Sequence, residues 1–291
     1  MPEVDPHTSA PPRTLRDPDA MREAIMAARA AGRRVGFVPT MGALHAGHVS
    51  LVDRAAAECD DVAVSIFVNP TQFAPHEDFA RYPRTFAADA AAVAGRKVRW
   101  IFAPDAEAMY PAGAATRVVV DGPARRFEGE IRPGHFSGVA TVVCRLFTAV
   151  PADVAYFGAK DWQQTLVVRR MVRDLGLPVG IVVCPTVREP DGLALSSRNA
   201  YLSPDERQRA VALAESLALA EAGWAGGDEP AAIEHRIRGH IESRGLTVDY
   251  AAVVDAESLE PPVAGRGAVA LVAARLGSTR LIDNRLLSPR G

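Results

Sequence analysis

Two histidines three residues apart, His45 and His48, follow a short apolar stretch at a point where a helix is expected to begin. Residues at this spacing lie on one face of a helix. The N-terminus of a helix attracts anions through its unpaired backbone N–H groups and its dipole, and two imidazole donors would extend that cradle. Gly47 between them leaves room for a phosphate or a flat ring. The pattern predicts a nucleotide-phosphate site, although it is neither a Walker A loop nor a G-x-G-x-x-G fingerprint.

Two other interpretations of His45 and His48 need no nucleotide. A zinc site is disfavoured, because the spacing is not H-E-x-x-H and no nearby cysteine or third histidine completes a ligand set. Two unrelated histidines on a helix surface would have no chemistry at all. For this segment taken alone, that second interpretation stays open.

Lysine occurs only at Lys97 and Lys160, so the other 31 of the 33 basic residues are arginine. Codon usage explains the general skew but not why two lysines remain. Lys160 lies with Asp161 just after Gly158, where a strand is expected to end. A lysine is a mobile point charge, which suits a phosphate that moves during a reaction, whereas arginine is a rigid fork. We interpret Lys160 as functional and Lys97 as a surface charge; an ordinary solvated lysine is the alternative for Lys160.

Two further polar segments lie where ligands are expected. One offers two hydroxyls and a guanidinium that suit phosphates, at Ser196, Ser197 and Arg198. The other follows a strand and offers neutral groups that suit the hydroxyls of a small polar substrate, at Asn69 and Gln72. Turn chemistry around Asn69 explains the second segment equally well.

The elements that must position these residues alternate between strand and helix. Apolar runs predict strands over residues 34–39, 62–68, 98–102, 118–120, 153–157 and 179–184, and helical patterns cover 19–31, 48–58, 86–94, 136–150 and 162–175. Such alternation indicates an α/β fold with a Rossmann-like, doubly wound parallel sheet. Ligands bind such sheets beyond the carboxyl ends of the strands.

The composition changes after residue 186. Ser203 and Glu206 have the spacing of a capping box that opens a long Ala-rich helix, and a second helix is expected over 229–243. Strands are expected over 248–254, 268–274 and 279–283. We therefore predict two domains, 1–186 with a flexible segment 1–16, and a smaller α+β domain over 187–291 with an antiparallel sheet.

Charge and composition exclude several partners. The 33 basic and 35 acidic residues leave a net charge of -2, which gives no electrostatic footprint for nucleic acid or an anionic membrane. The three cysteines are far apart and lack C-x-x-C spacing, so they suggest no disulfide framework. The acidic, Pro-rich start is unlike a signal peptide, and no apolar run reaches the roughly 18 residues of a membrane span. We expect a cytoplasmic protein.

Six motifs together closely resemble the pantothenate synthetase family of pantoate–beta-alanine ligases: PTMGALHAGH, SIFVNPTQF, YPR, RPGHFSGV, FGAKDWQQ and SSRNAYL. The resemblance runs from about residue 15 to Asn284. H-x-G-H alone marks only the wider nucleotidyltransferase superfamily. The resemblance implies an ATP-dependent, AMP-forming ligase that makes pantoyl adenylate, joins it to beta-alanine, and so serves pantothenate and coenzyme A biosynthesis. It also implies Mg²⁺ as a cofactor and a homodimer.

The resemblance carries site residues onto this sequence. ATP would be bound by Pro39, Thr40, Met41, His45, Gly47, His48, Gly158, Lys160, Asp161, Val187, Leu195, Ser196, Ser197 and Arg198. Of these, His45, His48, Lys160 and Arg198 would be the catalytic donors to phosphate. Pantoate would be bound by Asn69, Gln72, Val139, Val143 and Gln164, and residues 187–291 would form a lid.

The sequence departs from the family pattern at three positions. Ala159 replaces the glutamate that usually precedes the lysine, and Leu195 replaces the methionine that usually precedes Ser196. The acidic pair that typically helps magnesium is reduced to Asp89, which we take as the candidate metal ligand.

Three other functions are compatible with part of the pattern. Another acid-activating ligase would keep the histidines and Lys160 but differ at the substrate-binding amides. An aminoacyl-tRNA synthetase is disfavoured because the chain has no basic face. A non-catalytic nucleotide-binding regulator would have lost Lys160 or the second substrate site, and this sequence keeps both.

Overall fold

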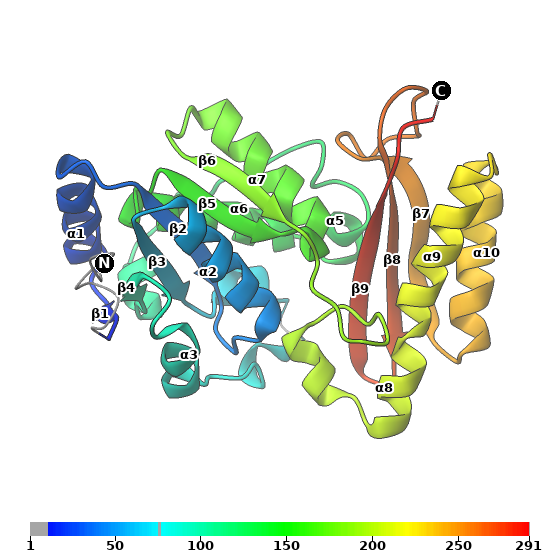
Figure 1. Ribbon diagram of the computed structural model, residues 1–291, viewed down its shortest axis with the longest axis horizontal. Coiled ribbons are helices and arrows are strands. Elements are labelled where there is room, and N and C mark those ends of the chain that lie inside the picture. The colour runs from blue at the N-terminus through cyan, green and yellow to red at the C-terminus, as the bar shows by residue number, and fades with distance from the viewer. Residues whose placement is uncertain (1–10, 75–76, 291) are drawn as a thin grey trace, which may run out of the picture. The chain divides into compact units, whose positions relative to one another are not determined.

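A six-stranded parallel sheet is the centre of the first part of the chain (Figure 1), in a computed structural model that describes residues 11–74 and 77–290. Its strands are β1 (Arg13–Leu15), β2 (Val35–Thr40), β3 (Asp61–Ile66), β4 (Val98–Phe102), β5 (Val154–Gly158) and β6 (Gly180–Cys184). Their order in the sheet is β1-β4-β3-β2-β5-β6, and all pairs are parallel. The chain changes direction across the sheet between β2 and β5. In such folds this switch point opens the ligand crevice.

Helices cover both faces of this sheet, which confirms the predicted doubly wound fold. One apolar core joins the sheet to α1 (Pro18–Ala30), α6 (His135–Ala149) and α7 (Trp162–Leu175), and another joins it to α2 (Ala46–Glu58) and α3 (Phe86–Val93). Neighbouring residues of β2 divide between the cores, because Phe37 enters the first and Val38 the second, both fully buried. Strands buried on both faces are typical of parallel sheets. Two short helices, α4 (Ala106–Met109) and α5 (Glu128–Ile131), lie in the connections.

Two predictions about strands are wrong. Residues 13–15, expected to be flexible, form β1, which pairs with β4 and buries Leu15; the remainder of the flexible prediction falls largely on residues 1–10, outside the described part. Residues 118–120 are not a strand. Thr141 accepts a hydrogen bond from Val118 N at 2.9 Å, and Ser137 donates to Val118 O at 3.4 Å. Side chains of α6 thus replace a neighbouring strand as partners of this backbone.

The predicted antiparallel sheet is confirmed in the last third of the chain. Strands β7 (Thr247–Asp255), β8 (Ala268–Leu276) and β9 (Thr279–Leu287) pair in sequence order, and α9 (Ala212–Ala225) and α10 (Pro230–Ser243) share an apolar core with them. The capping box of Ser203 and Glu206 is present and opens α8 (Pro204–Ala210). The prediction of a single long helix after it is wrong, because the helix is interrupted at Val211 between α8 and α9.

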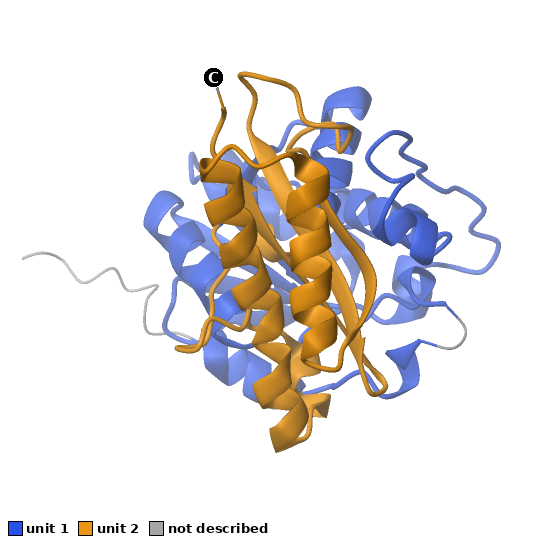
Figure 2. Cartoon of the chain, turned by 90° about the vertical axis from the view of Figure 1, so that its right-hand side faces the viewer, with its two compact units in different colours: residues 1–158, 163–184 blue, residues 159–162, 185–291 orange. Residues whose placement is uncertain are grey.

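The chain divides into two compact units, coloured separately in Figure 2. Unit 1 contains residues 1–158 and 163–184, and unit 2 contains 159–162 and 185–291. Lys160 therefore belongs to the unit of the antiparallel sheet, although it directly follows β5 in the chain. None of the helices in the described residues is long and apolar enough to span a membrane.

Candidate active site

The two histidines stand at the start of α2, immediately after β2 and a tight turn. His45 is the N-cap of the helix and His48 is its third residue, so only His48 lies within the first turn as predicted. Their ring centroids are 4.1 Å apart. The turn before them requires left-handed backbone at Gly42, where φ is +86°, and at Ala43, where φ is +51°. The geometry therefore brings both imidazoles to one helix N-terminus, beside the switch point of the sheet.

Backbone hydrogen bonds fix which ring nitrogen of each histidine carries a proton. His45 Nδ1 accepts from Gly47 N at 3.1 Å, and His48 Nδ1 accepts from His45 N at 3.4 Å. An imidazole nitrogen that accepts a hydrogen bond carries no proton, so the proton of each neutral ring is on Nε2. Each ring thus presents an N–H donor on the side away from the helix backbone, which is the polarity that a phosphate oxygen requires.

A buried carboxylate on α3 holds the turn in front of the histidines. Asp89 Oδ2 accepts from Ala43 N at 3.0 Å and Oδ1 accepts from Leu44 N at 2.8 Å, while Thr85 donates to Oδ1 at 3.1 Å. A Cβ on Gly42 would come within 2.9 Å of Oδ2, so a larger residue there would displace the carboxylate. Asp89 therefore anchors the backbone that places His45.

These contacts do not fit Asp89 to the metal-ligand role expected from the sequence. Its side chain is 2% exposed, and three hydrogen-bond donors already occupy its two oxygens. A cation would have to displace donors that the turn needs. No group of three or more His, Cys, Asp or Glu residues within residues 11–74 and 77–290 is arranged to hold a metal ion.

The turn after β3 carries Asn69 and Gln72, which are the N-cap and the last residue of the 3-10 segment η2 (Pro70–Gln72). Asn69 is 1% exposed, and its Oδ1 accepts from Thr71 N and from the Tyr110 hydroxyl. Its amide donates to Gln72 Oε1 at 3.1 Å. The Gln72 amide in turn lies 3.1 Å from Met41 Sδ in the turn after β2. The contacts of Asn69 are those of a residue that stabilises a turn, which was the alternative interpretation of this segment. The half-buried Gln72 instead links two predicted ligand-binding segments.

Helix α6 packs closely on this turn. A Cβ on Gly138 would lie 2.3 Å from the carbonyl oxygen of Thr71, so only glycine permits the crossing. Val139 and Val143 follow on α6, and both are buried in the core.

Two adjacent glutamines on α7 have different surroundings. Gln163 is buried and donates to Pro123 O and Arg126 O, both at 2.7 Å. Gln164 is half-buried, and its side chain makes no hydrogen bond to any described residue. Gln163 therefore stabilises the 123–128 segment, and Gln164 keeps its amide for another partner.

In unit 2, strand β9 holds the turn that carries Lys160. The side-chain amide of Asn284 donates to Ala159 O at 2.9 Å and to Lys160 O at 2.7 Å. Lys160 Nζ lies 3.9 Å from Asp161 Oδ1, and the lysine side chain is 19% exposed. The ammonium is thus largely shielded, close to one carboxylate, on a backbone fixed by Asn284.

The same strand supports the loop with the predicted serines and arginine. Asp283 accepts two hydrogen bonds from Arg188, at 2.6 and 2.9 Å, and Arg188 also donates to Gly192 O at 3.0 Å. Leu195 N donates to Val187 O at 3.0 Å, which brings those two predicted residues together. The loop continues through the half-buried residues Ser196, Ser197 and Arg198, of which the first accepts from the backbone of the last.

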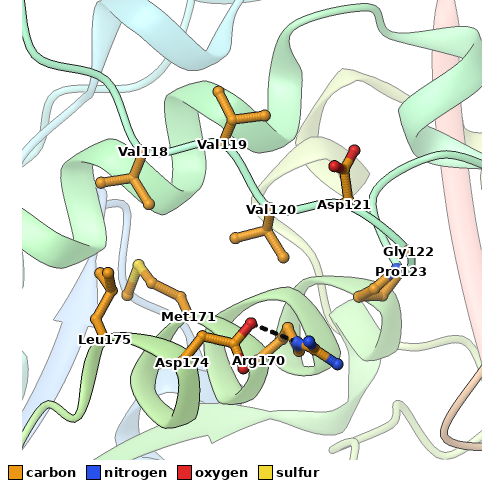
Figure 3. Close-up of a pocket in the computed structure, with 10 residues that line it drawn as sticks. All are labelled: Val118, Val119, Val120, Asp121, Gly122, Pro123, Arg170, Met171, Asp174 and Leu175. Carbon is orange, nitrogen blue, oxygen red and sulfur yellow. Dashed lines mark hydrogen bonds and ion pairs between the residues drawn. The ribbon is translucent and has the colours of Figure 1, made fainter.

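A surface cavity of about 430 Å³ lies elsewhere in unit 1, between residues 118–123 and helix α7. Figure 3 shows Val118 and Val120 facing Met171 and Leu175 across it, with the hydrogen-bonded pair Arg170 and Asp174 at its edge. None of the predicted site residues lines it. It is therefore separate from the histidine turn.

Several residues that support the site were not found from the sequence: Asn284, Asp283, Arg188, Gln163 and Gly138. Their contacts join positions that are far apart in the chain, which a local pattern does not reveal. For Gly138 a signal was present, because it lies in the RPGHFSGV motif, of which only Val139 received a role.

Comparison with known proteins gives a consistent result. The model of the pantoate-beta-alanine ligase family matches residues 13–286. The pantothenate synthetase of Koribacter versatilis is 50% identical over 265 residues, which are 89% of this chain and 90% of that protein. That of Rhizorhabdus wittichii is 51% identical over 277 residues, which are 94% and 98%.

Solved structures agree with these sequence matches. The pantothenate synthetase from Thermus thermophilus superposes with a TM-score of 0.88 at 49% identity, over 94% of this chain and 98% of that one. The pantoate-beta-alanine ligase from Francisella tularensis, complexed with beta-gamma ATP and beta-alanine, has a TM-score of 0.80 at 33% identity, over 94% and 97%.

Proposed function

The chain belongs to the pantoate–beta-alanine ligase family, and from that premise we propose that this ligase condenses pantoate with beta-alanine at the expense of ATP. First, a carboxylate oxygen of pantoate attacks the α-phosphorus, the bond to the bridging oxygen breaks, and diphosphate leaves. Then the amine of beta-alanine attacks the acyl carbon of pantoyl adenylate and loses a proton, and AMP leaves as the amide bond of pantothenate forms.

The observation that carries this proposal is the pair of imidazoles at the start of α2. Both Nδ1 atoms are engaged by backbone N–H groups, so both Nε2 atoms bear protons. In the first step negative charge moves onto the phosphate oxygens, and no protein nucleophile is needed. Donors held in place before the reaction stabilise that charge without reorganising. We assign His45 and His48 to this role, with Pro39, Thr40, Met41 and Gly47 shaping the nucleotide site.

Gly158 and residues of unit 2 would make further contacts to ATP. We assign Lys160, Arg198, Ser196 and Ser197 to the phosphates, and Gly158, Asp161, Val187 and Leu195 to the adenosine. What supports Lys160 is its shielded ammonium and a backbone turn fixed by Asn284. The two predicted domains, 1–186 and 187–291, would then be a nucleotide- and pantoate-binding domain and a lid.

Pantoate would be bound by side chains of unit 1. Gln72 and Gln164 suit its two hydroxyls, because both are half-buried amides and Gln164 keeps its hydrogen-bonding groups available. Val139 and Val143 suit its dimethyl group. Asn69 belongs to the same proposal, and its contacts within the turn favour a supporting role toward Gln72.

Magnesium remains a proposed cofactor, and Asp89 does not fit as its ligand. Mg²⁺ commonly binds through substrate phosphates and waters with few protein ligands, which would suit ATP. No step above depends on it. The homodimer and the cytoplasmic location predicted from the sequence stay predictions.

The test is AMP formation by the purified chain supplied with ATP, magnesium, pantoate and beta-alanine. We expect AMP only when both pantoate and beta-alanine are present. A panel of other hydroxy acids and amines serves as the control for substrate identity. Equal AMP formation with other acids, or none with pantoate, would reject this function in favour of a different acid-activating enzyme.

A further inference from the structure

The start of α6 and the residues just before it contact the turn of Gln72 through polar side chains as well as through Gly138. His135 Nδ1 lies 2.9 Å from the backbone carbonyl oxygen of Gln72, and Arg132 Nη2 donates to the same oxygen at 3.4 Å. Asn69 is held from the other side, because its amide donates to Gly138 O at 3.3 Å. Residues of α6 thus hold the backbone carbonyl of Gln72 and the side-chain amide of Asn69.

The partners of His135 determine its protonation state. A carbonyl oxygen can only accept, so Nδ1 must be the donor to Gln72. Arg132 Nη1 lies 3.0 Å from Nε2, and a guanidinium can only donate, so Nε2 must accept. The ring is therefore the neutral tautomer with its proton on Nδ1. Burial, followed by the positive charge of Arg132, lowers the pKa of His135 to about 4, which agrees with that geometry.

Arg132 is itself fixed by Glu77, so the hydrogen bonds connect four residues in series. Its Nε and Nη2 donate to the two Glu77 oxygens at 2.6 and 2.8 Å, and the arginine side chain is 15% exposed. Burial opposes ionisation of Glu77, but the hydrogen bonds and charge of Arg132 lower the pKa of Glu77 to about 2. Carboxylate, guanidinium, imidazole and carbonyl are thus linked in series.

We propose that Arg132 and His135 are positioning residues for the acid substrate, acting through the Gln72 carbonyl to hold the Gln72 side chain where it meets a pantoate hydroxyl. This inference rests on the proposed function. The Gln72 carbonyl is the last of η2, where the ordinary helical partner is missing. A loosely held carbonyl at that point would let the amide of the same residue turn away from the substrate.

Two substitutions of His135 distinguish its contact with Gln72 from its contact with Arg132. His135→Asn places an amide donor where Nδ1 was and keeps the bond to Gln72, whereas His135→Gln reaches the Nε2 position and loses that donor. We expect His135→Gln to raise the KM for pantoate by about three- to ten-fold, the scale of one hydrogen bond, with the KM for ATP within two-fold. His135→Asn should restore the wild-type KM for pantoate.

The control is Ser216→Ala, which removes a buried hydrogen bond to Leu213 O in α9 and should leave the KM for pantoate unchanged. Arg132→Lys provides a second measurement if His135→Gln does not fold; lysine keeps the charge beside Glu77 but not the fork, and should also raise the KM for pantoate selectively. An unchanged KM in both variants, or equal rises for pantoate and ATP, would overturn the inference. If the wild-type chain forms no AMP from pantoate, the proposed function fails instead.

Discussion

The side-chain amide of Asn284 donates a hydrogen bond to the backbone carbonyl of Lys160 over 2.7 Å, although 124 residues separate the two in the chain. Its second hydrogen goes to the preceding carbonyl, that of Ala159. An amide with two donors matches two consecutive carbonyls, and no acidic or apolar side chain offers this. The position of the Lys160 backbone therefore depends on strand β9.

Asn284→Asp should reduce AMP formation while leaving the fold intact. A carboxylate would face two carbonyl oxygens and repel both, so the lysine turn would shift. Loss of a buried hydrogen bond on this scale corresponds to about a ten-fold lower kcat/KM for ATP. The matched control is Asp249→Asn, which loses ion pairs with Arg275 and Arg280 in the same sheet and should retain activity. Equal losses in both variants would show that Asn284 matters only for stability.

The two lysines of the chain should respond oppositely to replacement by arginine. Lys160→Arg should lower AMP formation by about 10²-fold or more, the scale for losing one preorganised donor to transition-state charge, because a rigid fork cannot follow the phosphate. Lys97 Nζ instead donates to Ala56 O near the end of α2, and arginine can make the same bond. Lys97→Arg should therefore keep wild-type activity. Wild-type rates in Lys160→Arg would contradict the assignment.

Asp89→Asn should impair catalysis without changing the requirement for magnesium. An amide nitrogen would face one of the N–H groups of Ala43 and Leu44 that the carboxylate now accepts, so the histidine turn would loosen. We expect at least a ten-fold lower kcat, because the substitution removes a buried hydrogen bond to a charged carboxylate. The measurement is AMP formation at increasing magnesium concentration. If Asp89→Asn needs more magnesium than the wild-type chain for half-maximal activity, Asp89 is a metal ligand after all.

The sequence predicted what depends on local pattern and on residue chemistry. The parallel sheet was predicted from short apolar runs such as that of β2, and Lys160 stood out because lysine is rare in this chain. His45 was correctly placed beside a helix start, but a one-residue difference between N-cap and first turn is finer than sequence patterns resolve.

What the sequence could not reveal are the supports of the site. Asp89, Asn284 and Arg132 act through hydrogen bonds to backbone atoms distant in the chain, and no spacing rule encodes such pairs. Their side-chain types alone suggested other roles, as the metal-ligand expectation for Asp89 illustrates. The strand at 13–15 was missed for a similar reason, because its partner β4 begins 85 residues later.

The buried His135 should make the stability of the chain depend on pH between about 4 and 6.5. Its pKa is about 4 in the folded chain and about 6.5 when unfolded, so in this interval the unfolded chain binds the additional proton. The contribution of the neutral His135 to the free energy of unfolding is therefore complete above about pH 6.5 and is lost as the pH falls toward 4. Between pH 7 and pH 5 the wild-type chain should lose about 2 kcal/mol of unfolding free energy through this residue.

His135→Asn provides the comparison, because asparagine does not titrate and keeps the donor to Gln72. Urea unfolding of both chains at pH 7 and pH 5 measures the difference, and the other titratable groups contribute equally to each. The lowered pKa of Glu77, about 2, affects stability chiefly below about pH 4.5, which is below both pH values compared. If both chains lose the same free energy between the two pH values, His135 is not held neutral between Arg132 and Gln72, and the tautomer assigned from the hydrogen bonds is wrong.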